Sequence, residues 1–402
     1  MSTKESLNKD AVGLKRRADQ LGERLVGIRR TIHAHPEYGF QEHETARLVS
    51  GTLKEIGARV VEGVAKTGVV AELGKGTPIV AIRADMDALP LAEATKLPFA
   101  SQVPNMMHAC GHDAHVACAL GAAILLARES FVGTVRLLFQ PSEEQKDSEG
   151  KSGAMRLLEE GALDGVASII ALHTRALPVG SIGVTAGLAM AANDTIKIVI
   201  QGHAAHGAHP EEGLDAIAVS TQILGAIQQI VARRIPAISP AVISITTIHG
   251  GIKENIIADR VELGGTIRSA GGEVRRRLIE ELERTLDVGR ALGAVCELEL
   301  REGYPATTND ADVTMIIRDA AKAVLGQERV VEMPFDTWAE DFGYMTARVP
   351  GAMFWLGVTS ERVPFPVWHS PTFDLDEDAL PVGAAVLAAS ALRLLKPGSQ
   401  RR

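Results

Sequence analysis

The segment Pro78-Ile-Val-Ala-Ile-Arg-Ala-Asp-Met-Asp87 is the clearest indication of the fold class of this chain. Its unbroken apolar run is typical of a strand that is buried on both faces of a sheet. Similar runs follow at 134–139 and 167–172, and helical apolar spacing lies between the strands at 112–128 and 152–160. Strands that alternate with helices in this way predict an α/β domain in which helices cover a sheet.

A second domain is predicted from a change in the order of the elements near residue 191. We expect a strand, a helix, two strands, a helix and a strand at 194–202, 211–233, 241–249, 259–268, 272–292 and 296–302. This β-α-β-β-α-β order is the signature of a ferredoxin-like module. We therefore predict one domain made of residues 1–190 and 304–402, with a second domain, residues 191–303, inserted into it.

The composition narrows the class of partners. The net charge of the 402 residues is 42 − 50 = −8, which disfavours nucleic acid, and there is no polybasic patch for a membrane surface. No apolar run reaches the length of a transmembrane helix, and the polar first ten residues show no secretory signal. Three scattered cysteines do not form a disulfide framework. We therefore expect a cytoplasmic protein with neither nucleic acid nor a membrane as partner.

Polar side chains gather directly after the predicted strands. Asp85 and Asp87 follow the first strand, Glu143 and Glu144 follow the second, and His173 follows the third. Because ligands bind at the carboxyl ends of the strands in open α/β sheets, we expect these groups at one edge of the sheet. Carboxylate and imidazole groups gathered on loops are what a metal site requires.

The stretch Met107-His-Ala-Cys-Gly-His-Asp-Ala-His115 adds softer donors. The spacing of Cys110 and His112 lets both side chains reach one ion, and thiolate with imidazole suits zinc or a similar first-row metal. The alternative is a buried cysteine followed by a His-Asp pair that caps a helix. For the pair Glu143–Glu144 the alternative is a solvated loop, because charged residues continue to Lys151.

Together these motifs resemble the M20 metallopeptidase family, most closely its amidohydrolase branch of N-acyl-amino-acid, hippurate and auxin-conjugate hydrolases. The resemblance covers nearly the whole chain in unchanged order. It is carried by the segments 29–39, 82–90, 107–115, 140–144, 202–210, 250–268 and 369–371. The family has an inserted lid domain, often used for dimerisation, which agrees with the module expected at 191–303.

Carried over position by position, the resemblance implies a centre of two divalent metal ions, zinc or manganese. Its ligands would be Cys110, His112, Glu144, His173 and His369, with Asp87 as a carboxylate behind them. In the lid, His206 would stabilise the oxyanion, in some members from the partner subunit. Asn255 and Arg268 would hold the substrate carboxylate, Arg268 through a bidentate pair.

The resemblance implies metal-dependent hydrolysis of a C–N bond, namely the amide of an N-acyl amino acid or a similar conjugate. Two metal ions would lower the pKa of a shared water, and Glu143 would act as general base and then general acid. The expected partner is a small molecule that carries a carboxylate. The expected assembly is a homodimer or a larger homo-oligomer.

Several positions depart from this branch. The Gly-rich turn that usually follows the Glu pair is replaced by Gln145-Lys-Asp-Ser-Glu-Gly-Lys151, and Arg175 places a cation near the expected metals. Trp338 precedes Ala339, where the branch has a serine. These changes motivate an alternative activity, hydrolytic deamination of a small aminoaromatic carboxylate at the same site, with Arg175 as a substrate-binding residue. The simpler alternatives are a surface ion pair for Arg175 and a core position for Trp338.

Two further alternatives belong to other functional classes. In the first, Cys110 is the nucleophile of a metal-independent amidase, with His112 or His115 as its base. In the second, the chain is a non-catalytic module that binds a metal or another ligand on the same scaffold. Glu143 beside a full set of donors argues against the second alternative.

Overall fold

A computed structural model describes residues 3–396, with side chains described from residue 11 onward. Residues 1–2 and 397–402 of the first predicted domain lie outside this description. The chain forms two compact units. The large unit comprises Met1–Gly187, Thr308–Pro334 and Tyr344–Arg402, and the small unit comprises Leu188–Thr307 and Phe335–Gly343.

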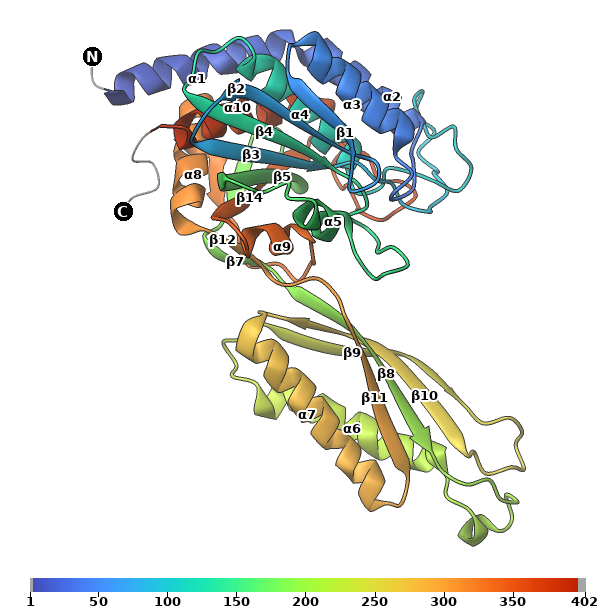
Figure 1. The fold of residues 1–402 in the computed structure, drawn as a ribbon. Coiled ribbons are helices and arrows are strands. Elements are labelled where there is room, and N and C mark those ends of the chain that lie inside the picture. The colour runs from blue at the N-terminus through green and yellow to red at the C-terminus, as the bar shows by residue number, and fades with distance from the viewer. Residues whose placement is uncertain (1–2, 397–402) are drawn as a thin grey trace. The chain divides into compact units, whose positions relative to one another are not determined.

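The large unit is built on one mixed sheet of eight strands in the order β1-β2-β4-β3-β5-β14-β6-β13 (Figure 1). The central strands β4, β3, β5 and β14 run parallel, and β1 and β2 join the sheet antiparallel. At the other edge, β6 pairs antiparallel with β14 and parallel with β13. Parallel central strands with helices on the sheet confirm the predicted α/β class. The strands are β1 (Arg59–Val64), β2 (Gly68–Lys75), β3 (Ile79–Asp85), β4 (Gly133–Gln140), β5 (Val166–Pro178), β6 (Ile182–Val184), β13 (Val330–Glu332) and β14 (Gly351–Thr359).

Two apolar helices, α4 and α10, pack against each other and against β3 and β5. They lie behind the strands in the view of Figure 1. All residues of α4 are buried, so this helix has no solvent face and its first turn is held rigidly. The helices of the large unit are α1 (Thr3–Gln20), α2 (Gly22–Ala34), α3 (His43–Glu55), α4 (His112–Leu126), α5 (Gly153–Glu159), α8 (Ala311–Leu325), η2 (Gln327–Arg329), η3 (Glu377–Ala379) and α10 (Leu380–Leu394). The short helix α9 (Phe342–Thr346) begins in the small unit and ends in the large one.

The small unit has the predicted order of elements. Its antiparallel sheet, β11-β8-β10-β9, is covered by α6 and α7. Isoleucines of β8 and α6 and leucines of α7 form its core. The elements are β8 (Ala192–Gln201), α6 (Ala216–Arg234), β9 (Ala241–Gly250), β10 (Arg260–Ser269), α7 (Gly272–Ala291) and β11 (Val295–Glu302). Short strands, β7 (Gly187–Met190) and β12 (Thr307–Asn309), lie where the chain passes between the units.

Two boundaries differ from the expectation. The helix expected from 211 begins at Ala216, because Pro210–Glu212 forms a separate 3-10 turn (η1) and Asp215 caps α6 by accepting the Ile217 N–H at 2.9 Å. The strand expected at 167–172 continues to Pro178, since β14 pairs along its length. None of the helices within residues 3–396 is both long enough and apolar enough to cross a membrane.

Candidate metal centre

The polar groups predicted at the strand ends do lie at one edge of the large sheet. β3 and β4 run in register, and Asp85 lies beside Gln140 at their carboxyl ends. Asp87 follows β3, and the pair 143–144 follows β4. His173 lies in β5, the other parallel neighbour of β3. The parallel centre of the sheet therefore delivers these side chains to one place.

Three soft donors converge at this edge. The ligand atoms of Cys110, His112 and His173 lie within 4.8 Å of one another, and all three residues are buried. The Sγ of Cys110 lies 3.6 Å from the Nε2 of His173. Gly111, with φ of +92°, turns the chain between the cysteine and the first residue of α4. A Cβ at Gly111 would lie 2.6 Å from the Oγ1 of Thr174, so the turn also needs the missing side chain.

Glu144 joins the cluster through two further groups of ligand atoms. One holds Glu144 with Cys110 and His369, and the other holds it with His112 and Glu143, each within 4.8 Å. The Oε1 of Glu144 lies 3.1 Å from the Nε2 of His369 and 3.9 Å from the Nε2 of His112. The structure thus brings together all five predicted ligands and the predicted base, from segments far apart in the chain.

Hydrogen bonds fix which ring nitrogens face the cluster. The Nδ1 of His112 lies 2.9 Å from the carbonyl oxygen of Asp87 and 3.2 Å from its Oδ1, so this nitrogen carries the proton. The Nδ1 of His173 donates in the same way to the carbonyl oxygen of Thr174 at 2.8 Å. In both rings the Nε2 lone pair is therefore left for a ligand, which is the usual arrangement of a metal-binding histidine.

Two buried atoms of the cluster have no well-directed hydrogen bond. They are the Nε2 of His112 and the Oε1 of Glu144, the latter in spite of the nearby ring of His369. Buried polar atoms are almost always satisfied, so an unsatisfied facing pair indicates a missing partner. Once the His112 ring is neutral, both atoms are acceptors, and a divalent cation satisfies acceptors from nitrogen, oxygen and sulfur alike. The donor set therefore fits metal ions.

The charges of the cluster agree with this. Burial lowers the pKa of His112, but the charges of Asp85, Asp87 and Glu144 outweigh burial and raise this pKa to about 10. Burial, with the nearby Glu144 and other carboxylates, raises the pKa of the Cys110 thiol. An excess of negative charge around a neutral thiol is the setting in which a cation stabilises both the carboxylates and the thiolate.

Asp85 supports the site from behind through His115, and it was not among the predicted site residues. Asp85 lies 2.6 Å from the NH1 of Arg83 and accepts from the Nδ1 of His115 at 2.6 Å. The Nε2 of His115 accepts the Thr174 N–H at 3.1 Å, which fixes its tautomer. Asp85 also lies 3.7 Å from the Nε2 of His112. Its position at the same strand end as Asp87 was the signal that could have identified it.

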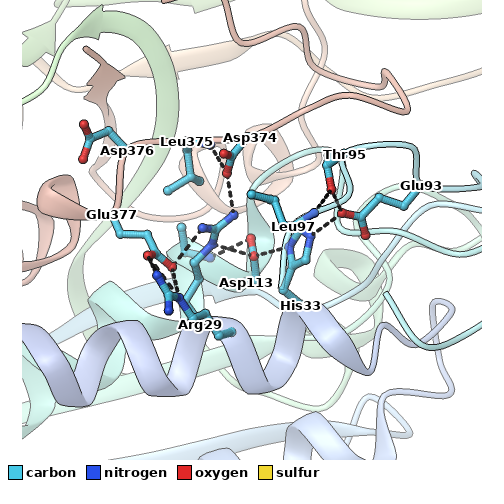
Figure 2. A network of polar contacts seen from close by, with 12 residues as sticks. Arg29, His33, Glu93, Thr95, Leu97, Asp113, Asp374, Leu375, Asp376 and Glu377 are labelled. Carbon is cyan, nitrogen blue, oxygen red and sulfur yellow. Dashed lines mark hydrogen bonds and ion pairs between the residues drawn. The ribbon is translucent and has the colours of Figure 1, made fainter. Parts of the chain in front are cut away.

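A second network, with Arg29, His33 and Asp113 fully buried, lies at the first turn of α4 (Figure 2). The guanidinium of Arg29, on α2, contacts Asp113 at 3.0 Å, Glu377 at 3.0 Å and Asp374 at 3.4 Å. His33, one turn further along α2, lies with its Nδ1 2.8 Å from the Oδ2 of Asp113. Asp113 directly follows the ligand candidate His112, and Asp374 follows His369 by five residues. Arg29 therefore joins two segments that carry donors.

The charged loop at 145–151, which departs from the family pattern, is held by contacts of Asp147 within the loop and with two cations outside it. The carboxylate of Asp147 contacts the Nζ of Lys66 at 2.7 Å and the guanidinium of Arg156 at 2.6 Å. It also accepts the backbone N–H groups of Glu149 at 2.9 Å and Lys151 at 3.1 Å. These donors hold the pKa of Asp147 well below its usual range, in spite of the opposing effect of burial.

The predicted lid residues lie at two ends of the small unit. His206 and Asn255 are neighbours, because the Gly207 N–H donates to the Asn255 carbonyl at 2.9 Å and His206 bridges to Ile256. Both side chains are exposed. Arg268 lies near the opposite end of β10, where it pairs with Asn193. The structure thus brings His206 and Asn255 together but leaves Arg268 apart from them.

Two residues that motivated the alternative activity are half-buried. Arg175 lies on β5 two residues after His173, so the alternation of a strand directs both side chains to the same face. Trp338 belongs to the segment of the small unit at Phe335–Gly343, and its carbonyl accepts the Ala191 N–H at 2.9 Å.

Comparison with known proteins gives consistent matches. The pattern of the peptidase family M20/M25/M40 matches residues 81–393. Thermostable carboxypeptidase 1 of Saccharolobus solfataricus is 40% identical over 390 residues, which are 94% of this chain and 98% of the relative. N-acetylcysteine deacetylase of Bacillus subtilis is 39% identical over 381 residues, 93% and 97% of the two chains. The crystal structure of the Bacillus subtilis YXEP protein, described as a dinuclear metal-binding peptidase of the M20 family, is 37% identical with a TM-score of 0.81 and covers 94% and 99%.

Proposed function

Because this chain belongs to peptidase family M20/M25/M40 and is thus a metal-dependent hydrolase of C–N bonds, we propose that it cleaves the amide of an N-acyl amino acid or a similar conjugate. The observation that carries the proposal is the convergence of thiol, imidazole and carboxylate donors on one sheet edge, beside a further buried carboxylate. A peptidase with two metal ions among the similar structures supports it.

The proposed cofactor is a pair of divalent metal ions, zinc or manganese. The residues that would hold them are Cys110, His112, Glu144, His173 and His369. When bound, such ions lower the pKa of a water and polarise the carbonyl that it attacks. Asp87 is the proposed carboxylate behind the metal ligands, because it fixes the tautomer of His112 and accepts the Glu144 N–H at 3.0 Å.

Glu143 is the proposed general base. It is buried, and its carboxylate lies in one group with His112 and Glu144. A carboxylate in this place would accept the proton of the attacking water and then deliver it to the leaving nitrogen. Burial protects this proton transfer from exchange with bulk water.

His206 is the proposed stabiliser of the oxyanion. Its Nδ1 accepts the Ala208 N–H at 3.1 Å, so its Nε2 must carry the proton of the neutral ring. A neutral histidine held in this tautomer presents an N–H donor, which is what a developing oxyanion requires. The tautomer thus supports the proposed role independently of any resemblance.

The substrate class is proposed from the cationic groups and the relatives. Arg268 is half-buried, and burial lowers the pKa of its guanidinium while Asp194 opposes this effect. A partly desolvated guanidinium binds a carboxylate more strongly than a solvated one. Arg268, Asn255 and Arg175 are therefore the proposed substrate-binding residues. N-acetylcysteine, which the name of one relative contains, is itself an N-acyl amino acid.

The test is a screen of the metal-loaded protein on N-acetyl and N-benzoyl amino acids, dipeptides and aminobenzoates, with free amine and ammonia measured separately. We expect amine release from acyl amino acids, loss of activity on chelation and its recovery on addition of zinc or manganese. Glu143→Gln should lower kcat about 10²- to 10⁴-fold while elemental analysis shows an unchanged metal content.

Three outcomes would contradict the proposal. Ammonia release from aminobenzoates without acyl cleavage would replace it by deamination. Full activity after exhaustive chelation, with inactivation by a thiol alkylator, would make Cys110 a nucleophile. A kcat of Glu143→Gln equal to that of the wild type on every active substrate would show that Glu143 is not the general base.

A further inference from the structure

The two glutamates of the site lie on a loop with an unusual backbone. Ser142, the residue before the proposed base, has φ of +47°. Residues other than glycine rarely adopt this left-handed conformation, and it persists only where the surroundings hold it in place. Ser142 is fully buried and its carbonyl accepts the Gly153 N–H at 2.9 Å. The backbone conformation of Ser142 therefore sets the direction in which the side chain of Glu143 points.

A buried carboxylate outside the predicted site holds that conformation. Glu42 precedes α3, is fully buried, and accepts the Ser142 N–H on its Oε1 at 2.8 Å. Its other oxygen accepts from the hydroxyl of Thr67. A hydrogen bond to a carboxylate is stronger than one to a neutral acceptor, so it can offset a strained backbone. Nothing in the sequence around Glu42 signalled this contact.

The backbone N–H groups of the residues before and after Glu143 are both bound by buried carboxylates. Asp87 accepts the N–H of Glu144 at 3.0 Å, and Glu42 accepts the N–H of Ser142 at 2.8 Å. The backbone of Glu143 thus lies between two amides that are each fixed by a buried carboxylate. Asp87 also touches His112, whereas Glu42 touches none of the proposed metal ligands in the contacts described for residues 11–396.

The segment before Glu42 packs directly on the same loop. A Cβ at Gly39 would lie 2.9 Å from the Cβ of Ser142 and 2.7 Å from the Nε2 of Gln145. The segment 39–42 therefore meets Ser142 both through a hydrogen bond and through close packing.

We propose that Glu42 is a positioning residue for the reaction, which aims Glu143 by holding the N–H of Ser142 in its left-handed conformation. The inference rests on the proposed function, because it assumes that Glu143 is the base. Its consequence is specific: loss of the Glu42 acceptor should lower turnover without weakening substrate binding.

The test compares Glu42→Ala with Glu37→Ala. Glu37 is a matched control, because its carboxylate also accepts two backbone N–H groups, those of Glu44 and Thr45 at 2.9 Å each, but these belong to the start of α3. We expect Glu42→Ala to lower kcat about 10- to 100-fold, as a small misplacement of a catalytic group does, with KM and metal content unchanged. Glu37→Ala should keep the kcat of the wild type, whatever its effect on the melting temperature.

Glu42→Gln provides the rescue, because its amide oxygen can still accept the Ser142 N–H. We expect most of kcat to return in this variant. If Glu42→Ala does not fold, Gly39→Ala tests the same geometry by displacing Ser142 while Glu42 remains, and a similar fall in kcat is expected.

Two results overturn the inference: equal kcat values for Glu42→Ala and Glu37→Ala at full metal content, or a wild-type kcat for Gly39→Ala where Glu42→Ala is unfolded. A failure of the proposed function is distinguished from both, because the wild type itself would then show no metal-dependent amide hydrolysis on the panel.

Discussion

His33 is a single buried side chain that makes the stability of this protein depend on pH. It lies between two carboxylates, with its Nδ1 2.8 Å from Asp113 and its Nε2 3.4 Å from Glu93 (Figure 2). Burial lowers the pKa of His33, but the hydrogen bonds with Asp113 and Glu93 outweigh it and raise this pKa to about 9. The ring is therefore charged in the folded protein at neutral pH.

The sign of the effect follows from linkage. A histidine whose pKa is raised from 6.5 to about 9 stabilises the fold fully below pH 6.5 and loses this contribution as the pH rises through 9. The contribution is on the order of 3 kcal/mol. We expect the free energy of unfolding of the metal-loaded wild type to fall by about this amount more than that of His33→Gln between pH 6.5 and 9.

Denaturant unfolding at the two pH values is the measurement, and His35→Gln is the control. His35 is exposed and lies two residues away on the same segment. It should leave the pH dependence of the wild type unchanged. A pH dependence in His33→Gln equal to that of the wild type would show that this ring is neutral in the fold.

Single residues also show how far the site could be predicted from sequence. Donor type, spacing and position after strands predicted that the cysteine–histidine pair, the glutamate pair and His173 gather at the sheet edge. His369 was implied only by the family resemblance, and the structure brings it to the same groups. Asp85 was expected at this edge but was given no role in the site. Glu42 and Arg29 were not predicted, because their importance depends on burial and on partners far away in the chain. A glutamate before a helix has the same sequence signature whether it faces water or Ser142.

At the scale of elements, Arg29 joins α2 to α4 and to the segment before α10. Its guanidinium is fully buried and touches three carboxylates. Arg29→Met would leave these carboxylates without their cation, so we expect the free energy of unfolding to fall by about 3–5 kcal/mol. We also expect weaker metal binding, measured by competition with a chelator, because the first turn of α4 and the segment after His369 lose their common anchor.

The neighbouring arginine is a matched control. Arg30 also pairs with Glu377, at 2.6 Å, but its side chain is 47% exposed. Exposed ion pairs contribute little, so Arg30→Met should change the unfolding free energy by no more than about 1 kcal/mol and leave metal affinity unchanged. Equal effects of the two substitutions would show that the buried network has no special part in the site.

The elements also show which part of the fold the sequence determines locally. The apolar run at 79–83 and the ferredoxin-like order are confirmed, because period and order are local properties. The extension of β5 to Pro178 was missed, since it depends on pairing with β14, almost two hundred residues later. The antiparallel strand β1 was not predicted either, because most of it is exposed and it lacks the pattern of a buried strand. Its partner β2 was also not predicted, although half of its residues are buried.

In the whole molecule, His206 and Arg268 lie near opposite ends of the sheet of the small unit, which bears on how many chains form one active site. Arg260 pairs with Gln201 at the end of β8 that leads to His206, whereas Arg268 pairs with Asn193 at the other end. These ends are eight residues, or about 27 Å, apart. One lid therefore does not present His206 and Arg268 to the same small substrate, and we expect one of them to come from a second copy.

Oligomers mixed from two variants test whether His206 or Arg268 acts on the site of a second copy. We expect refolded mixtures of Glu143→Gln with His206→Ala, or of Glu143→Gln with Arg268→Ala, to recover about a quarter of the wild-type activity, in one pairing but not in both. The recovering pairing names the residue that acts on the partner's site. Recovery in neither pairing would contradict the expectation of a shared site, and sedimentation of the mixtures would show whether an oligomer had formed.

The span of the Arg29 network has a consequence for biosynthesis. Arg29 and Glu377 are 348 residues apart, and His369 lies in the last tenth of the sequence. A nascent chain on the ribosome therefore exposes Arg29 and the Glu pair long before their late partners are translated. The proposed ions are therefore bound completely only once the segment around His369 has been translated, so a cell starved of metal should accumulate the protein in its unloaded form.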